Sequence, residues 1–81
     1  MISVCQIKAA RALLGWSAQD LANKSGVGAT TLRRYEMSEG IPSANAKSLQ
    51  TVIETFQSAG IEFTGDPLKN PGVTLHLEKT K

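Results

Sequence analysis

Few residues in this 81-residue sequence have side chains that could carry out covalent or metal chemistry. His76 is the only histidine and Cys5 is the only cysteine, so the sequence has no set of histidine and cysteine ligands for a metal ion. No Ser/His/Asp group or Gly-x-x-x-x-Gly-Lys phosphate loop is present. His76 falls on the polar face of a predicted strand, where we expect an ordinary surface residue. We therefore expect no enzymatic activity, no metal and no cofactor.

The single cysteine also indicates a compartment. Cys5 cannot form an internal disulfide, which fits a reducing cytosol. We expect it to be a small, partly buried residue of the first helix rather than a reactive thiol.

Length and composition are those of one small globular domain. The chain is 41% hydrophobic and 20% charged, which is too apolar for a disordered protein. At this size a multi-domain enzyme and a large cofactor cavity are excluded. No run of residues approaches the roughly 18–20 apolar residues of a membrane span, and the N-terminus does not have the pattern of a signal peptide.

The positive charge is concentrated in the first half of the chain. Residues 1–47 carry six basic and three acidic side chains, whereas residues 48–81 carry three basic and four acidic ones. A basic first half is compatible with a polyanionic partner, although the excess is small.

The sequence predicts four helices within the first 60 residues. Ser3 with Gln6, and Ser17 with Asp20, have the three-residue spacing of N-terminal capping boxes. A glycine follows the first, second and fourth apolar pattern and ends each helix. The predicted helices span residues 4–14, 18–25, 29–36 and 44–59, the last of them capped by Ser43.

After residue 60 the hydrophobic period changes from that of a helix to that of a strand. Ile61 and Phe63 alternate with polar residues, and so do Val73, Leu75 and Leu77. The turn-rich segment between them predicts a hairpin with a long loop. Since a two-stranded hairpin is marginal alone in water, its apolar face must pack either on the fourth helix or on a second chain in a symmetric dimer.

The expected fold is therefore mainly α, with four helices followed by a C-terminal β-hairpin. The second and third helices are short and are joined by a three-residue turn containing glycine, which is the geometry of a DNA-binding helix-turn-helix. We therefore divide the chain into a helical DNA-binding domain over residues 1–60 and a hairpin extension over residues 61–81. Ala22 is small enough for a close helix crossing, and Leu32 and Tyr35 share one face of the third helix.

The run from Gly15 to Glu36 resembles the phage-repressor-like helix-turn-helix family, also called the xenobiotic-response-element regulators. The resemblance is carried by spaced positions within residues 4–59: Gly15, Ser17, Leu21, Ala22, Gly26, Val27, Leu32 and Glu36. The family usually has glutamine at the first residue of the second helix, where this chain has Ala18 and displaces Gln19 by one position. Its third helix opens with Gly28-Ala29 in place of long amides, so we expect fewer base contacts from the first turn.

The resemblance implies a lambda-repressor-like domain that binds double-stranded DNA, with the recognition helix 29–36 in the major groove. It implies a cytoplasmic transcriptional regulator of bacterial or phage type that acts as a homodimer. The implied base-contacting residues are Ala29, Thr30, Arg33 and Arg34. The implied phosphate-contacting residues are Ser17, Gln19, Gly28, Ser43 and Lys47. Arg11 and Glu36 occupy the positions of a structural ion pair in this family.

Two other functions stay open at this stage. The chain could be the antitoxin of a toxin–antitoxin pair, which binds its own operator and a toxin. It could also be a helix-turn-helix that only contacts other proteins, an alternative favoured by the short side chains at the start of the third helix. Salt dependence separates these classes, because phosphate contacts make affinity fall steeply with added salt.

Overall fold

The structure, a computed structural model, describes residues 2–42 and 46–77. The elements within these ranges are α1 (Val4–Leu14), α2 (Ala18–Ser25), α3 (Ala29–Met37), α4 (Ala46–Ser58), β1 (Ile61–Thr64) and β2 (Gly72–Leu75). The expected mainly α fold with a hairpin after the helices is thereby confirmed. The predicted Ser43 cap and the first residues of the predicted fourth helix lie outside the described residues.

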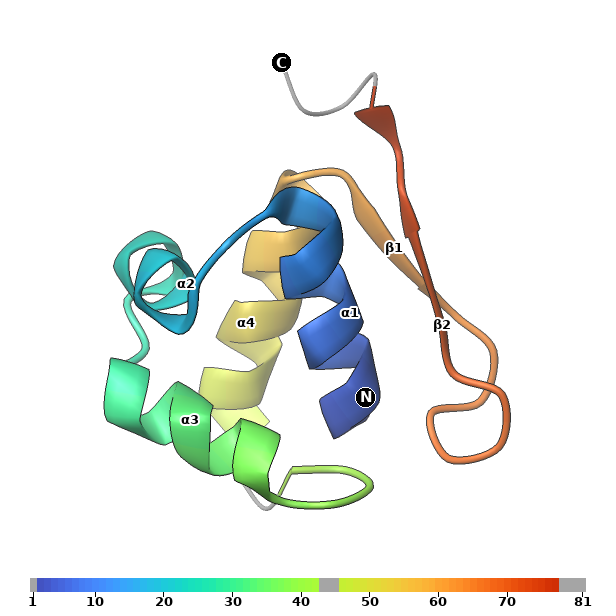
Figure 1. The fold of residues 1–81 in the computed structure, drawn as a ribbon, viewed down its shortest axis with the longest axis horizontal. Helices are drawn as coiled ribbons and strands as arrows, with labels where there is room; N and C mark the ends of the chain where they lie inside the picture. Colours follow the sequence, from blue (N-terminus) through green and yellow to red (C-terminus); the bar gives the residue numbers. More distant parts are fainter. Residues whose placement is uncertain (1, 43–45, 78–81) are drawn as a thin grey trace.

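The helix pair α2–α3 and the hairpin occupy opposite sides of the molecule. In Figure 1, α1 and α4 lie in the centre, α2 and α3 on the left and the two strands on the right. Within residues 2–42 and 46–77, no helix combines the length and the apolar composition required to cross a membrane.

The predicted capping residues form hydrogen bonds at the starts of α1 and α2, and glycines end both helices. In α2, Ser17 N–H donates to Asp20 Oδ2 at 2.9 Å, and Asp20 N–H donates to Ser17 Oγ at 3.0 Å. At the start of α1, Ser3 N–H donates to Gln6 Oε1 at 2.9 Å. Gly15 and Gly26 end α1 and α2 with left-handed φ values of 69° and 79°.

One hydrophobic core joins all four helices and the hairpin. Its fully buried members come from every helix: Ile7, Leu21, Leu32, Val52 and Phe56. The Phe56 ring stacks on Trp16 at a centroid distance of 5.8 Å and meets Phe63 of β1 edge-on at 6.0 Å. Phe56 of α4 therefore contacts both the segment before α2 and the hairpin.

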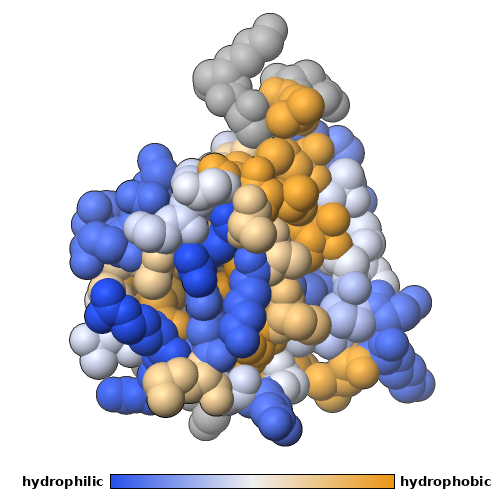
Figure 2. Space-filling view, in the orientation of Figure 1, coloured by the Kyte–Doolittle hydropathy of each residue, from blue (hydrophilic) through white to orange (hydrophobic). Residues whose placement is uncertain are grey.

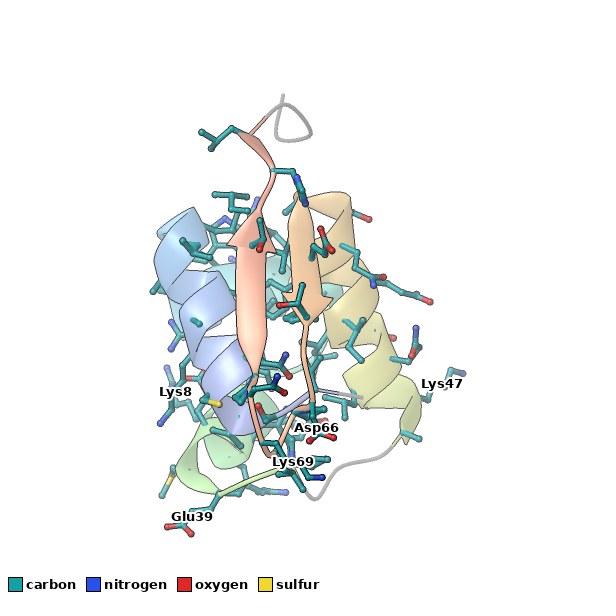
Figure 3. All side chains as sticks on the ribbon, turned by 90° about the vertical axis from the view of Figure 1, so that its right-hand side faces the viewer. Lys8, Glu39, Lys47, Asp66 and Lys69 are labelled. Carbon is teal, nitrogen blue, oxygen red and sulfur yellow. The ribbon has the colours of Figure 1, made fainter. Side chains whose placement is uncertain are left out.

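The apolar face of the hairpin packs on helices of its own chain. The antiparallel register pairs Ile61 with Leu75 and Phe63 with Val73, so these side chains share one face. Ile61 is buried, and the other three pack against the helical core. β1 lies against α4 and β2 against α1, as Figure 3 shows. Of the two alternatives that the sequence leaves for this face, the structure has the packing within one chain, with α1 contributing as well as α4.

Two expectations about burial are wrong. Leu77 was expected on the inner face of the hairpin, but β2 ends at Leu75 and the Leu77 side chain is 71% exposed. Cys5 was expected to be partly buried, but its position in the first turn of α1 faces outward and its thiol is exposed.

A buried glutamine attaches the hairpin to the start of α1. Gln6 is only 2% exposed, and its Nε2 donates to the carbonyl oxygens of Gly72 at 3.1 Å and Thr64 at 3.3 Å. Its Oε1 accepts the N–H of Ser3. One amide therefore satisfies backbone groups of the N-terminal segment and of both strands, which are separated from it by some sixty residues.

Replacing Gln6 by alanine should lower the free energy of unfolding by about 1–3 kcal/mol, because the buried Ser3 N–H loses its partner and the partly buried carbonyl groups of Thr64 and Gly72 each lose a hydrogen bond. Urea denaturation followed by circular dichroism measures this change. Gln57→Ala, at an exposed position of α4, is the matched control and should stay within about 0.5 kcal/mol of the unsubstituted protein. Equal effects of the two substitutions would contradict the assigned role of Gln6.

Candidate nucleic-acid interface

The α2–α3 unit is held rigidly by its inner face. Leu32 and Tyr35 of α3 are buried, and Ala22 of α2 is buried where the two helices pack together. Val27, in the turn between them, packs against the same core. Gly26 has the left-handed conformation that this three-residue turn needs and that other residues adopt only at a steric cost. The outer face of α3 is consequently presented in one orientation.

That outer face carries three of the four residues implied as base contacts. Thr30, Arg33 and Arg34 are exposed. Ala29, which was expected to face solvent with them, is half-buried and packs against the core. The reason is its spacing, since Ala29 lies three residues before the buried Leu32 and so shares its side of the helix.

The guanidinium groups of the two arginines of α3 are not engaged by other described residues. Within the described residues, neither the Arg33 nor the Arg34 guanidinium takes part in an ion pair or donates a hydrogen bond. Each therefore presents all five N–H donors to the exterior. A bidentate guanidinium fits the O6/N7 edge of guanine, and it also fits a phosphate.

The predicted capping box occupies two backbone N–H groups at the N-terminus of α2. Ser17 N–H is already bonded to the Asp20 carboxylate, and Asp20 N–H to the Ser17 hydroxyl. These hydrogen bonds with Ser17 hold the pKa of Asp20 below its usual value, so the carboxylate stays charged at neutral pH. The donors left at this end for a phosphate are the first-turn N–H groups of Ala18 and Gln19.

Gln19 itself is exposed, as a phosphate contact requires. Its Nε2 donates to Asn23 Oδ1 at 3.0 Å, one turn further along α2. Asn23 was not considered at the sequence level, although the i, i+4 spacing of these two amides predicts their contact.

Residue 28, at the N-terminus of α3, could carry a side chain without strain or steric clash, so the fold does not require a glycine there. Its φ is −59°, and a Cβ built there would meet only the Thr31 Oγ1 at 3.9 Å. No side chain caps this helix end. The absence of a side chain at Gly28 thus leaves the first N–H groups of α3 uncovered, which permits close approach of an anion.

The start of α4 is described only from Ala46. Lys47, in its first turn, is exposed and points outward (Figure 3). Ser43, the other residue implied as a phosphate contact near this helix, lies outside the described residues.

An ion pair joins α1 to the end of α3. Arg11 Nε donates to Glu36 Oε2 at 2.7 Å and Arg11 Nη2 to Glu36 Oε1 at 2.6 Å. The third contact, from Arg11 Nη1 to the carbonyl of Trp16 at 2.9 Å, reaches the segment that leads into α2. The two side chains are 22% and 13% exposed, and the hydrogen bonds to Glu36 raise the pKa of Arg11. Three of the five N–H donors of Arg11 are therefore occupied in fixing α3 and the entry to α2.

One further cation near this surface was missed at the sequence level. Lys24 of α2 places its Nζ 5.1 Å from the centre of the Trp16 ring, in cation–π geometry. The two residues are eight apart on different segments, so no local spacing predicts the contact. Among the described residues, no group of three His, Cys, Asp or Glu side chains could hold a metal ion.

Arg11→Met should destabilise the fold by about 3 kcal/mol, because it leaves the Glu36 carboxylate partly buried without its partner. Arg11→Met combined with Glu36→Leu should lose less than the single substitution, since both charges are then removed. Thermal denaturation of the three proteins measures the difference. If both variants melt with the unsubstituted protein, the pair has no structural role.

A comparison with protein families identifies the segment that contains α2 and α3. Residues 7–46 match the model of a helix-turn-helix family, a segment that contains α2, the turn and α3 together with most of α1. No curated protein matches the chain. The matched segment includes the Arg11–Glu36 pair and the exposed face of α3. This segment is a helix-turn-helix of the phage-repressor-like, xenobiotic-response-element type.

Proposed function

We propose that this protein binds double-stranded DNA sequence-specifically, as a small cytoplasmic transcriptional regulator with α3 in the major groove. The observation that carries the proposal is the outer face of α3. Thr30, Arg33 and Arg34 project from a helix whose opposite face is buried, and neither guanidinium is paired within the described residues. A rigid helix with unpaired donors is suited to reading base edges.

Arg33 is assigned to a base and Arg34 to a phosphate. Arg33 follows Thr30 by three residues and Ala29 by four, so these three residues lie on the same face of α3. We assign the base contact to Arg33 because it shares this face with the first turn of the helix. Arg34 is rotated from Arg33 by about 100°. The methyl groups of Thr30 and of the half-buried Ala29 are suited to contact with a thymine methyl.

Phosphate contacts would come from the neighbouring helix ends. The first N–H groups of α3 after Gly28, those of α2 near Gln19, and the exposed Lys47 offer donors on three different segments. The Ser17 hydroxyl can still donate its proton outward, since it only accepts from Asp20. Ser43 is retained as a proposed contact from the sequence alone.

We propose that the regulator acts as a homodimer on a pseudo-palindromic site. A two-fold symmetric protein matches half-sites whose centres are about 10 bp apart, one turn of the duplex. A toxin as additional partner, as in an antitoxin, is compatible with the same DNA-binding surface.

The test uses an operator selected from random duplexes with the unsubstituted protein. Arg33→Ala should cost about 1–3 kcal/mol on this operator and relax its sequence preference, as expected for a base contact. Arg34→Ala should weaken binding to the operator and to a scrambled duplex about equally, and it should lower the salt slope by about one. Titrations of both duplexes at two salt concentrations measure these effects.

Lys69→Ala provides the control, because Lys69 is an exposed cation on the hairpin loop and belongs to neither α2 nor α3 (Figure 3). It should leave both affinities unchanged. If Arg33→Ala and Arg34→Ala also bind both duplexes like the unsubstituted protein, α3 does not read DNA. The function would then be that of a protein interaction module.

A further inference from the structure

The outer edge of β2 carries unpaired backbone groups. His76 N–H donates to the Gly60 carbonyl at 2.8 Å, so residues 60 and 76 form a hydrogen-bonded pair. Such pairs alternate along an antiparallel ladder, which makes Glu62–Thr74 the next bonded pair. The N–H and C=O groups of Val73 and Leu75 therefore point away from β1. In the part of the chain that the structure describes, no other strand pairs with this edge.

Exposed apolar side chains lie beside this edge. Leu13 near the end of α1 is 48% exposed, and Leu77 just after β2 is 71% exposed. Figure 2 shows hydrophobic side chains gathered where α1 and the hairpin face the viewer. Exposed apolar side chains that form one patch mark contact surfaces more often than those that are scattered singly.

The geometry of α1 and β2 brings these two leucines to the same end of the molecule. Gln6 of α1 is bonded to Gly72 of β2, and the two elements run in the same direction from that point (Figure 1). Leu13 lies seven residues further along the helix, a rise of about 10 Å. Leu75 lies three residues further along the strand, also about 10 Å. Leu13 is thus level with the end of β2, and Leu77 follows directly.

The geometry points to a two-fold dimer in which β2 of one protomer pairs antiparallel with β2 of a second copy, with Leu13 and Leu77 packed around the new strand pair. This inference builds on the homodimer of the proposed function and assigns its interface. The two hairpins then form one four-stranded sheet, and the outward groups of Val73 and Leu75 gain partners.

Three observations favour a second copy as the occupant. An antiparallel pair of identical strands is self-complementary about a two-fold axis, as a symmetric dimer requires. Residues 70–77 carry no acidic side chain, lysine or arginine, so pairing β2 with itself brings no formal charges of these residues together. β1 is less suitable because pairing it with itself would bring two copies of Glu62 close together.

The position of the interface also suits DNA binding. α2 and α3 lie on the side of the molecule opposite the hairpin, so the exposed face of α3 stays free in such a dimer (Figure 1).

The test is the mass in solution of the full chain without DNA, measured by sedimentation over a range of micromolar concentrations. The unsubstituted protein should be dimeric, and the double variant Leu13→Lys, Leu77→Lys should dimerise at least about tenfold more weakly, because four charges enter an apolar contact. Met37→Lys with Leu68→Lys is the matched control, since these side chains are 85% and 66% exposed elsewhere on the surface. This control should dimerise like the unsubstituted protein, and circular dichroism should show all three proteins folded.

Amide hydrogen exchange of the same proteins locates the interface. The Val73 and Leu75 N–H groups should exchange more slowly in the dimer than in the double variant, whereas Phe63 N–H on the outer edge of β1 should not change. A monomeric unsubstituted protein, a double variant that dimerises normally, or protection at Phe63 instead of Val73 would each overturn the assignment. None of these results depends on whether the protein binds DNA.

Discussion

The Arg11 guanidinium joins three parts of the chain that the backbone alone would leave free to shift. Its planar fork bonds both oxygens of Glu36 at the end of α3, and its remaining nitrogen bonds the Trp16 carbonyl at the entry to α2. Ion pairs of this kind contribute little net stability compared with apolar side chains of the same size, but the loss of one partner is costly. The main role of the Arg11–Glu36 pair is to hold the helices in position. It fixes the angle between the two helices that are proposed to meet DNA.

Phe56 is the second point on which the arrangement depends. Its ring stacks on Trp16, which precedes α2, and meets Phe63 of the hairpin with its edge. Because Phe56 is completely buried, the helix-turn-helix and the hairpin share one core. Residues 61–75 thus form part of the packing that supports the helix-turn-helix, although they lie outside the segment that matches the family.

The helices could be predicted because their signals are local. Ser17 with Asp20, and the glycines after α1 and α2, act over three or four residues, and the predicted bounds of these two helices agree with the structure. Long-range contacts were not predictable from local pattern. The capping-box spacing of Gln6 gave no sign that its Nε2 bonds the hairpin. Nothing in the sequence around Lys24 indicated that its Nζ lies over the Trp16 ring. At the proposed DNA surface, the exposure of Arg33 followed from helix periodicity. The half-burial of Ala29 was also predictable from its three-residue spacing to Leu32, but the expectation of a solvent-facing Ala29 followed the family resemblance instead.

The hydrogen bonds between Gln6 and the hairpin have a consequence for the order in which the molecule is assembled. They connect residues 58 and 66 positions apart, so the contact between the first helix and the last strand closes nearly the whole described chain into a loop. Contacts of such long sequence separation form late, after local helices and turns. During synthesis on the ribosome, the helix-turn-helix residues emerge first and the side of α1 that β2 covers waits for the last strand. The nascent chain therefore exposes this side of α1 until residues 61–75 have left the ribosome.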